Sequence, residues 1–311
     1  MDAMKLYRLQ IRPLSPWATP WQADTLFGLL CWTCARTSGA AVLQQEILEP
    51  SLDRRPPFVV SDAFPSGWFP VPASLKSTEF LNSRPKTDRG DSKLIRKSNW
   101  MTRAGFLRYV NGEPPTSDSF ARISPVTAEG EVHNQIARGS GSTDNGELFV
   151  SDTWQLRDGV NSLDVFVRTT PAFLSRFSEL MVALSQIGFG ADISTGRGEF
   201  EVIEAAVEET ELPATGSRCV VLSTFQPHPE DPIDGCWDLF TKYGKLGAGF
   251  GVDNVFKRPM LMLRPGAVFQ PYQDLVGHCL RGCDFLSTET LDQLHDSRPA
   301  HGAFGLTVGC C

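Results

Sequence analysis

The order of strand and helix patterns in this sequence of 311 residues predicts an α+β fold. An alternating segment comes first, a helical pattern follows it, and a second strand and helix stand beyond a long stretch of weak periodicity. If that stretch hides one further strand, the order over residues 1–210 is βαββαβ. The sequence therefore predicts two ferredoxin-like (RRM-like) domains, residues 1–210 and 217–311, with a large insertion at about 50–150 in the first.

The first strand and the first helix are predicted in residues 5–12 and from about residue 24 onward. In KLYRLQIR the apolar side chains of Tyr7, Leu9 and Ile11 alternate with polar ones, which is typical of a half-exposed strand with a basic outer face. After a proline-rich turn, Asp24 or Thr25 can cap a helix. The apolar face of that helix is formed by Leu26, Leu29, Leu30 and Thr33.

Residues from about 50 to 150 show weak periodicity and many turn-forming residues, so we interpret them as a functional insertion. Within it, residues 84–108 hold eight Lys and Arg against two Asp, a net charge of +6. Because the whole chain carries −7, the remainder carries −13. The protein is predicted to be an acidic body with one basic arm.

The second strand and helix pair follows the insertion. NSLDVFVRTT (161–170) alternates as a strand does, and Thr170 with Pro171 is typical of a helix start. The apolar stripe of this helix is Phe173, Phe177, Leu180, Met181, Leu184 and Ile187. Gly188 ends the helix, and GEFEVIEAAV (198–207) is predicted to be the last strand of the first domain.

The C-terminal part is predicted to begin after an acidic linker, ELPATGS (211–217). Strands are expected in RCVVLSTFQP (218–227), PMLMLRPGAVF (259–269) and HGAFGLTVGCC (301–311). A short helix is expected in IDGCWDLFTKYG (233–244).

The segment GFGADISTGRGEF (188–200) is a glycine-rich loop between a helix and a strand. It lacks the Lys-Ser/Thr pair of a Walker A loop, and it does not run from strand to helix as a dinucleotide fingerprint does. Its glycines leave backbone amides open to an anion such as a phosphodiester chain, and Ser194, Thr195 and Arg197 add donors. The alternative is a helix C-cap and a tight turn, which need only one or two glycines.

The composition excludes several other classes of protein. No apolar run reaches the roughly 20 residues of a membrane span, and the first residues lack the apolar core of a signal peptide, so a cytoplasmic location is expected. Eight cysteines in a chain of this length do not form a disulfide framework. The pair Cys31 and Cys34 could bind zinc, but a buried thiol is the default for each, and we expect no metal or cofactor.

The glycine-rich loop resembles that of the RAMP superfamily of CRISPR-associated proteins. Further stretches resemble one branch of it: ADTLFGLLCW (23–32), HNQIARGSGSTDNGELF (133–149), FKRPMLMLRPGAVF (256–269) and HGAFGLTV (301–308). Their order along the chain is similar to that of the fourth subunit of type III-A (Csm) effector complexes, in the Cas-five group.

This resemblance implies a non-catalytic RNA-binding subunit that holds the 5′ repeat-derived handle of crRNA. The implied partners are the large Cas-ten-type subunit and a backbone RAMP subunit. The inserted arm would be a β-hairpin thumb that contacts the duplex of guide and target RNA, and no cofactor is implied.

The candidate RNA-binding residues fall into three groups. The loop supplies Gly188, Gly190, Ser194, Thr195, Gly196, Arg197 and Gly198, while Asp192 is expected to brace the loop. The basic arm supplies Arg84, Lys86, Arg89, Lys93, Arg96, Lys97 and Arg103 for phosphate contacts. The stretch beside the thumb supplies His133, Asn134 and Arg138.

Several alternatives remain open. The chain could be a crRNA-processing endoribonuclease of the same superfamily that uses His133 or His301, or the equivalent subunit of a type III-B or III-D complex. It could also be an interaction protein without an RNA role. Trp17 and Trp21 could stack on bases or pack in the core, and a looser basic set could face the handle or only the solvent: Lys242, Lys245, Lys257 and Arg258.

Overall fold

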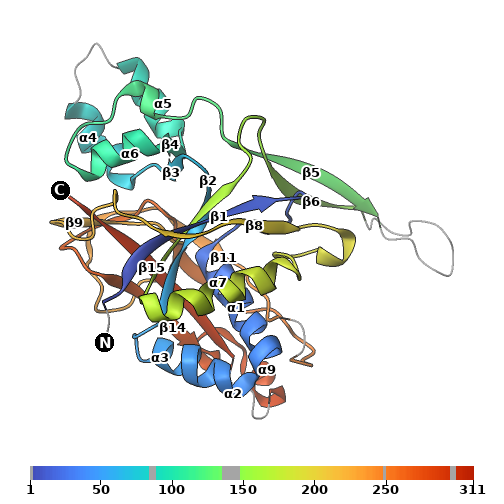
Figure 1. Ribbon diagram of the computed structural model, residues 1–311. Helices are drawn as coiled ribbons and strands as arrows, with labels where there is room; N and C mark the ends of the chain where they lie inside the picture. The colour runs from blue at the N-terminus through green and yellow to red at the C-terminus, as the bar shows by residue number, and fades with distance from the viewer. Residues whose placement is uncertain (1–2, 84–88, 135–147, 248–249, 295–298) are drawn as a thin grey trace.

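Two antiparallel sheets form the centre of the computed structural model, which describes residues 3–83, 89–134, 148–247, 250–294 and 299–311 (Figure 1). The helices are α1 (Ala23–Ser38), α2 (Ala40–Leu43), α3 (Glu49–Leu52), α4 (Thr78–Ser83), α5 (Arg89–Lys97), α6 (Arg103–Val110), α7 (Pro171–Ser185), α8 (Gly282–Phe285) and α9 (Thr288–Gln293). The strands are β1 (Lys5–Pro13), β2 (Phe58–Pro65), β3 (Trp68–Pro70), β4 (Trp100–Thr102), β5 (Val126–Asn134), β6 (Leu148–Leu156), β7 (Leu163–Thr169), β8 (Phe200–Glu208), β9 (Arg218–Val221), β10 (Asp234–Cys236), β11 (Leu239–Lys242), β12 (Met260–Leu263), β13 (Val268–Gln270), β14 (Leu275–Arg281) and β15 (Ala300–Cys310).

The first sheet has the strand order β2-β7-β1-β8, and each neighbouring pair is antiparallel. Along the chain its elements run β1-α1-β2-β7-α7-β8, which is the predicted βαββαβ order. The strand missed by the sequence pattern is β2, because all its residues are buried and none alternates with an exposed one. The insertion therefore lies between β2 and β7, at residues 66–162, and not at about 50–150.

Helices α1 and α7 cover one face of the first sheet and form a core with it (Figure 1). Helix α7 begins as predicted, because the Thr170 hydroxyl accepts a hydrogen bond from the Phe173 amide at 3.2 Å. Helix α1 differs from the prediction, since neither Asp24 nor Thr25 caps it. Instead the amide of Ala23 donates to the carboxylate of Asp62 on β2 at 2.8 Å, so the sheet itself supplies the cap.

The second sheet has the order β10-β13-β9-β15-β14. Its first strand along the chain, β9, is paired with β15. The chain thus has the predicted α+β class with two sheet domains, although only the short helices α8 and α9 connect β14 to β15. The helix predicted at 233–244 is wrong, since this segment forms β10 and β11. Thr241 is exposed between the partly buried Phe240 and Lys242, which is the alternation of a strand and not of a helix.

The two sheets share a core. One face of the first sheet packs on α1 and α7, and the other packs on the second sheet. Side chains from this second face, such as Phe64 and Phe166, belong to the same buried cluster as Val220 and Phe304. The predicted linker at 211–217 packs into this junction: Leu212 is buried and the carbonyl of Pro213 accepts from the amide of Gly309 at 2.7 Å. The segment is therefore a packed connection and not a free spacer.

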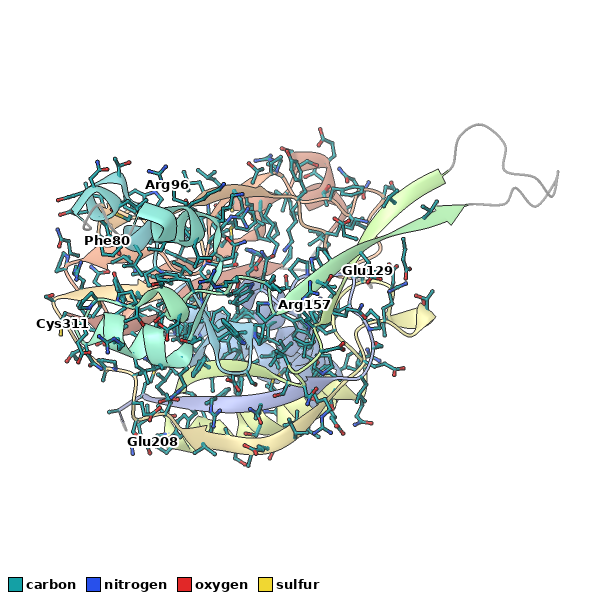
Figure 2. The ribbon with its side chains drawn as sticks, turned by 90° about the horizontal axis from the view of Figure 1, so that it is seen from above. Phe80, Arg96, Glu129, Arg157, Glu208 and Cys311 are labelled. Atoms are coloured by element: carbon teal, nitrogen blue, oxygen red, sulfur yellow. The ribbon has the colours of Figure 1, made fainter. Side chains whose placement is uncertain are left out.

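The insertion has two parts that leave the sheet in different directions (Figure 1). A helical part, residues 68–121, contains α4, α5, α6 and the short ladder of β3 and β4. An extended hairpin of β5 and β6 follows, and it projects from the opposite end of the molecule in both views (Figures 1 and 2). The expected hairpin exists, but the identification of the basic arm with it is wrong, because the described part of residues 84–108 belongs to the helical part.

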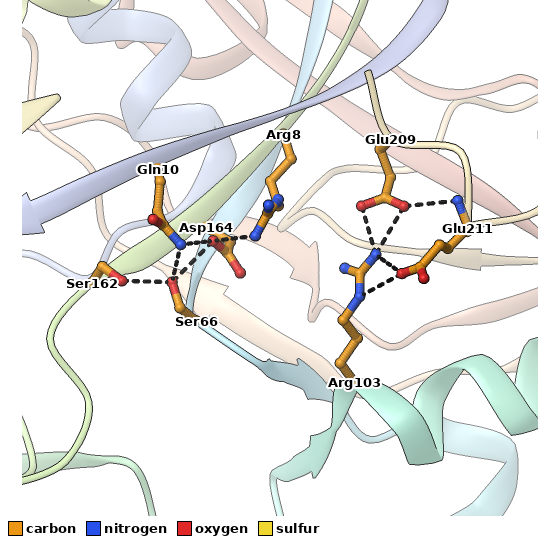
Figure 3. Close-up of polar contacts among 8 residues, drawn as sticks. All are labelled: Arg8, Gln10, Ser66, Arg103, Ser162, Asp164, Glu209 and Glu211. Atoms are coloured by element: carbon orange, nitrogen blue, oxygen red, sulfur yellow. Dashed lines mark hydrogen bonds and ion pairs between the residues drawn. The ribbon is translucent and has the colours of Figure 1, made fainter. Parts of the chain in front are cut away.

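Polar side chains close the root of the insertion (Figure 3). The amide of Ser66, just after β2, donates to the carbonyl of Ser162, just before β7, at 2.9 Å. The buried carboxylate of Asp164 accepts from the Ser66 hydroxyl at 2.9 Å and from the Gln10 amide group at 3.1 Å. Both ends of the insertion are thus fixed to the centre of the first sheet.

All eight cysteines are free thiols, and Cys31 and Cys34 are buried in the core below the first sheet. Within the described ranges, no three His, Cys, Asp or Glu side chains are arranged to hold a metal ion. No helix in those ranges is both long enough and apolar enough to cross a membrane. Because both thiols are buried in this core, Cys31 and Cys34 pack as core residues do.

Candidate nucleic-acid interface

The glycine-rich loop begins where α7 ends. The amide of Gly188, whose φ is 101°, donates to the carbonyl of Leu184 at 2.9 Å. The next side chain, Phe189, is fully buried and stacks on Trp21 with 3.7 Å between ring centroids. The loop is therefore anchored to the core at its start. The possibility that Trp21 stacks on RNA bases is wrong, because this ring is buried.

Most of the glycines in the loop are required by its own folding. A Cβ atom on Gly190 would lie 2.6 Å from the Cβ of Thr19, and one on Gly198 would lie 2.0 Å from the carbonyl oxygen of Phe189. Both residues also have positive φ values, as does Gly196, around which there is open space. The number of glycines alone does not indicate a ligand, because all four have positive φ values in the turn from α7 to β8.

The outer part of the loop presents backbone donors to solvent. Across the described part of the chain, the amides of Asp192, Ile193 and Ser194 have no hydrogen-bond acceptor. The carbonyl of Asp192 accepts from the amide and the hydroxyl of Thr195, at 3.0 and 2.8 Å, so its backbone braces the turn. Three consecutive free amides on a braced turn are suited to bind an anion.

The hairpin strand β5 lies against this loop. Arg197 forms an ion pair with Glu131 of β5, and its side chain is 16% exposed. Trp17, which precedes α1, is buried and exchanges two backbone hydrogen bonds with Trp154 of β6, at 3.0 and 2.9 Å. The structure thus brings Arg197 and the hairpin together, and Trp17 joins them as a core residue that cannot stack on bases.

The hairpin carries the predicted stretch beside the thumb. His133 and Asn134 lie at the end of β5, opposite Phe149 and Leu148 of β6. Their side chains and all of Arg138 lie outside the part that the structure describes. Their RNA contacts stay a prediction.

The predicted arm residues lie far from the glycine-rich loop. Lys93, Arg96 and Lys97 are exposed on α5, at the end of the molecule opposite the hairpin (Figure 2). Arg84, Lys86 and the side chain of Arg89 fall outside the described residues. The loop and α5 therefore form two separate surfaces.

Arg103 has a structural partner that the sequence did not suggest (Figure 3). Its guanidinium donates to Glu209 at 2.7 Å and to Glu211 at 2.6 Å, and the Glu209 side chain is 4% exposed. These acids follow β8, so the pairs tie the helical part of the insertion to the first sheet. We therefore reassign Arg103 from phosphate binding to this junction, because its Nε and Nη2 groups donate to the two carboxylates and its Nη1 group is buried.

We expect Arg103→Gln to lower the free energy of unfolding by about 2–4 kcal/mol, because Glu209 would remain buried without a cation. Arg108→Gln is the matched control, since Arg108 and Glu113 form an exposed pair at 3.5 Å that contributes about 0–1 kcal/mol. Urea unfolding of both variants measures the difference. Equal effects would contradict the structural role of Arg103.

A buried polar cluster joins the start of α1 to the second domain. The ammonium of Lys242 donates to Asp24 at 2.7 Å, to Gln22 at 2.7 Å and to Thr25 at 3.0 Å. On the other side, Nε2 of His301 lies 3.3 Å from the Asp24 carboxylate. Burial alone would raise the pKa of Asp24, but Lys242 and His301 outweigh it and lower this pKa below its usual range.

Lys257 and His301 continue the cluster. The ammonium of Lys257 lies 2.9 Å from Nδ1 of His301 and 4.9 Å from the ring centroid of Phe285. Burial lowers the pKa of Lys257 to about 8, although Asp24 opposes the shift. The solvent-facing role considered for Lys242 and Lys257 is therefore wrong. His301 is 6% exposed, so this histidine cannot reach an RNA substrate as an endoribonuclease would require.

The lowered pKa of Lys257 predicts a pH dependence of stability. Between about pH 8 and the ordinary lysine pKa of 10.5, the unfolded chain binds more protons here than the folded chain, so this contribution to stability rises with pH. We expect the free energy of unfolding of the wild type, minus that of Lys257→Met, to increase by about 1–3 kcal/mol across this range. Urea titrations at several pH values measure it, with Lys245→Met as control. A constant difference would contradict the prediction.

No protein-family model and no curated protein matches this chain. Among solved structures, one chain of the Csm1-Csm4 cassette in complex with pppApA matches with a TM-score of 0.66 at 16% identity, over 98% of both chains. A chain of the same cassette in complex with AMPPNP gives 0.65 at 16% identity, also over 98% of both. A chain of the Csm3-Csm4 subcomplex in the type III-A CRISPR-Cas interference complex gives 0.58 at 13% identity, over 99% of this chain and 100% of that chain. Over nearly its whole length, the protein thus has the fold of a chain found in these Csm assemblies.

Proposed function

We propose that this protein is the Csm4-type subunit of a type III CRISPR-Cas effector complex and binds the 5′ repeat-derived handle of crRNA without cleaving it. It contacts the large Cas-ten-type subunit on one side and a backbone RAMP subunit on the other. Csm4 is the name common to the Csm1-Csm4 and Csm3-Csm4 assemblies, and both match from end to end. This agreement in fold, over chains of nearly equal length, carries the proposal.

The geometry of the glycine-rich loop supports a phosphate-binding role. The three free amides of Asp192, Ile193 and Ser194 lie on an exposed turn whose ends are held by Phe189 and Gly198. Arg197 of the loop is paired with Glu131 of β5, so an RNA strand held by the loop can pass directly to the hairpin. Backbone amides bind phosphates without reading base identity, which fits the role of a holding site.

The test is to tag the protein in its native cells, purify it gently and sequence the 5′ ends of the RNA that accompanies it. RNAs that share one 5′ segment followed by variable sequence, together with a large subunit and repeated smaller subunits, are the expected result. RNA with heterogeneous ends, or none, would contradict the handle-binding role. Cleavage of a repeat RNA by the purified protein, lost in His133→Ala, would instead favour the endoribonuclease.

A variant pair tests the loop itself. Ser194→Asp places a carboxylate beside the free amides, and we expect it to reduce RNA recovery about tenfold because phosphates are repelled. Ser194→Asn has a similar size without the charge, and should retain RNA. If both variants retain RNA equally, the phosphates do not lie at this loop.

A further inference from the structure

A hollow of about 290 Å³ lies beside α5, and this helix is at the end of the molecule opposite the hairpin (Figure 1). Three cations from two separate segments line it: Lys93 and Lys97 of α5, and Arg122, which lies 25 residues further along the chain. The other lining residues are Leu94, Ser98 and Ala121, so none of the described lining residues is acidic.

The hollow is held in a fixed shape. Ile95, next to Leu94 on α5, is fully buried, and the Ser98 hydroxyl donates to the carbonyl of Ala121 at 2.9 Å. The amide of Ala121 donates to the carbonyl of Trp100 at 2.9 Å, which ties the segment before Arg122 to β4. The two segments that carry the cations are therefore linked directly beneath the hollow.

Some cations of the insertion are paired with carboxylates, and others are not. Arg103 is paired with Glu209 and Glu211, and Arg108 with Glu113. By contrast Lys93, Lys97 and Arg122 have no carboxylate within ion-pair distance among the described residues, and all three are exposed. Lys93 and Lys97 are four residues apart on one helix, where like charges repel and slightly destabilise the fold. In a protein with net charge −7, such a group is explained by a ligand that supplies negative charge.

We infer that this hollow binds the phosphodiester backbone of single-stranded RNA, as a second contact separate from the glycine-rich loop. The inference rests on the proposed RNA-binding function and adds a position to it. Lysine ammonium groups and an arginine fork are the donors that phosphate oxygens accept from most strongly, and none of the three has a partner within the described ranges. The hollow lacks aromatic side chains among its lining residues, so it grips the backbone and does not read bases.

The test measures binding of a labelled single-stranded oligouridylate to the full chain by fluorescence anisotropy over a series of salt concentrations. The variant is Lys93→Gln/Lys97→Gln/Arg122→Gln. Loss of three phosphate contacts should flatten the slope of log affinity against log salt by about 2, and should weaken binding about tenfold or more in dilute salt.

The control is Lys5→Gln/Arg12→Gln/Arg55→Gln, which removes the same charge from exposed side chains that are paired with Glu208, Glu201 and Asp53. It should change the affinity less than about twofold. If the wild type binds the RNA and the two triple variants behave alike, this inference fails and the proposed function stands. If the wild type binds no RNA, both fail.

A second arm uses ATP as the competitor, matched to unlabelled oligouridylate in phosphate concentration. Displacement by oligouridylate alone supports a backbone site. If ATP displaces the labelled RNA equally well, the hollow takes nucleotide phosphates, and its assignment to an RNA backbone is overturned.

Discussion

Asp24→Ala is expected to lower the free energy of unfolding by about 3–5 kcal/mol, because it leaves Lys242 without a counter-charge in the interior. The Asp24 side chain is 1% exposed and that of Lys242 is 15% exposed, so water replaces little of the lost interaction. Asp24 also lies in the first turn of α1, where a carboxylate is favoured by the helix dipole. Urea or guanidinium unfolding followed by circular dichroism measures the change.

Two further variants make this result specific. Arg12→Ala removes one partner of an exposed pair, whose side chains are 49% and 44% exposed, and should cost about 0–1 kcal/mol. The double variant Asp24→Leu/Lys242→Met replaces both charges and should be more stable than Asp24→Ala, since the ammonium of residue 242 is no longer left without its partner. A single variant within about 1 kcal/mol of the wild type would show that this ion pair does not hold α1 to the second domain.

Gly198→Ala is expected to be the most damaging single substitution in the glycine-rich loop. The new Cβ would lie 2.0 Å from the carbonyl oxygen of Phe189, and the φ of 70° adds strain for any residue other than glycine. Relief requires the backbone of Phe189 to move, which would disturb its stacking on Trp21. We expect a loss of about 3 kcal/mol or more in the free energy of unfolding, together with loss of RNA binding.

Gly196→Ala is the matched control for this prediction. Gly196 has a φ of 82°, but no atom lies within 4 Å of the position of its Cβ, so only the backbone strain of about 1 kcal/mol remains. Unfolding titrations of the two variants compare them directly. If Gly196→Ala were as damaging as Gly198→Ala, the close approach to Phe189 would not be the cause.

The regular elements of the first domain could be predicted because their periodicity is undisturbed. In β1 the residues Tyr7, Leu9 and Ile11 are buried and their neighbours are more exposed, and α7 has a conventional start at Thr170. Strand β2 lies between two layers, so all its residues are buried and the alternation disappears.

The position of the candidate RNA-binding loop could be predicted from the sequence, but the contacts that its residues and the predicted cations make could be predicted only in part. The glycine-rich loop lies where the sequence places it, between α7 and β8, but its glycines are explained by their positive φ values and, at Gly190 and Gly198, by close contacts. Arg103 and Lys242 looked like surface cations because their acidic partners are 106 and 218 residues away in the sequence. Arg122 was missed for a related reason, since only the fold brings it beside α5.

The core shared by the two sheets has a consequence for how the chain folds as it is synthesised. Strand β15 lies between β9 and β14 in the second sheet, yet it is made after both of them. Until then the face of the first sheet that carries Phe64 and Phe166 is not packed against Phe304 and its neighbours. The nascent chain therefore exposes a large apolar surface until β15 has been made, and in this interval it depends on chaperones more than a chain of two independent domains would.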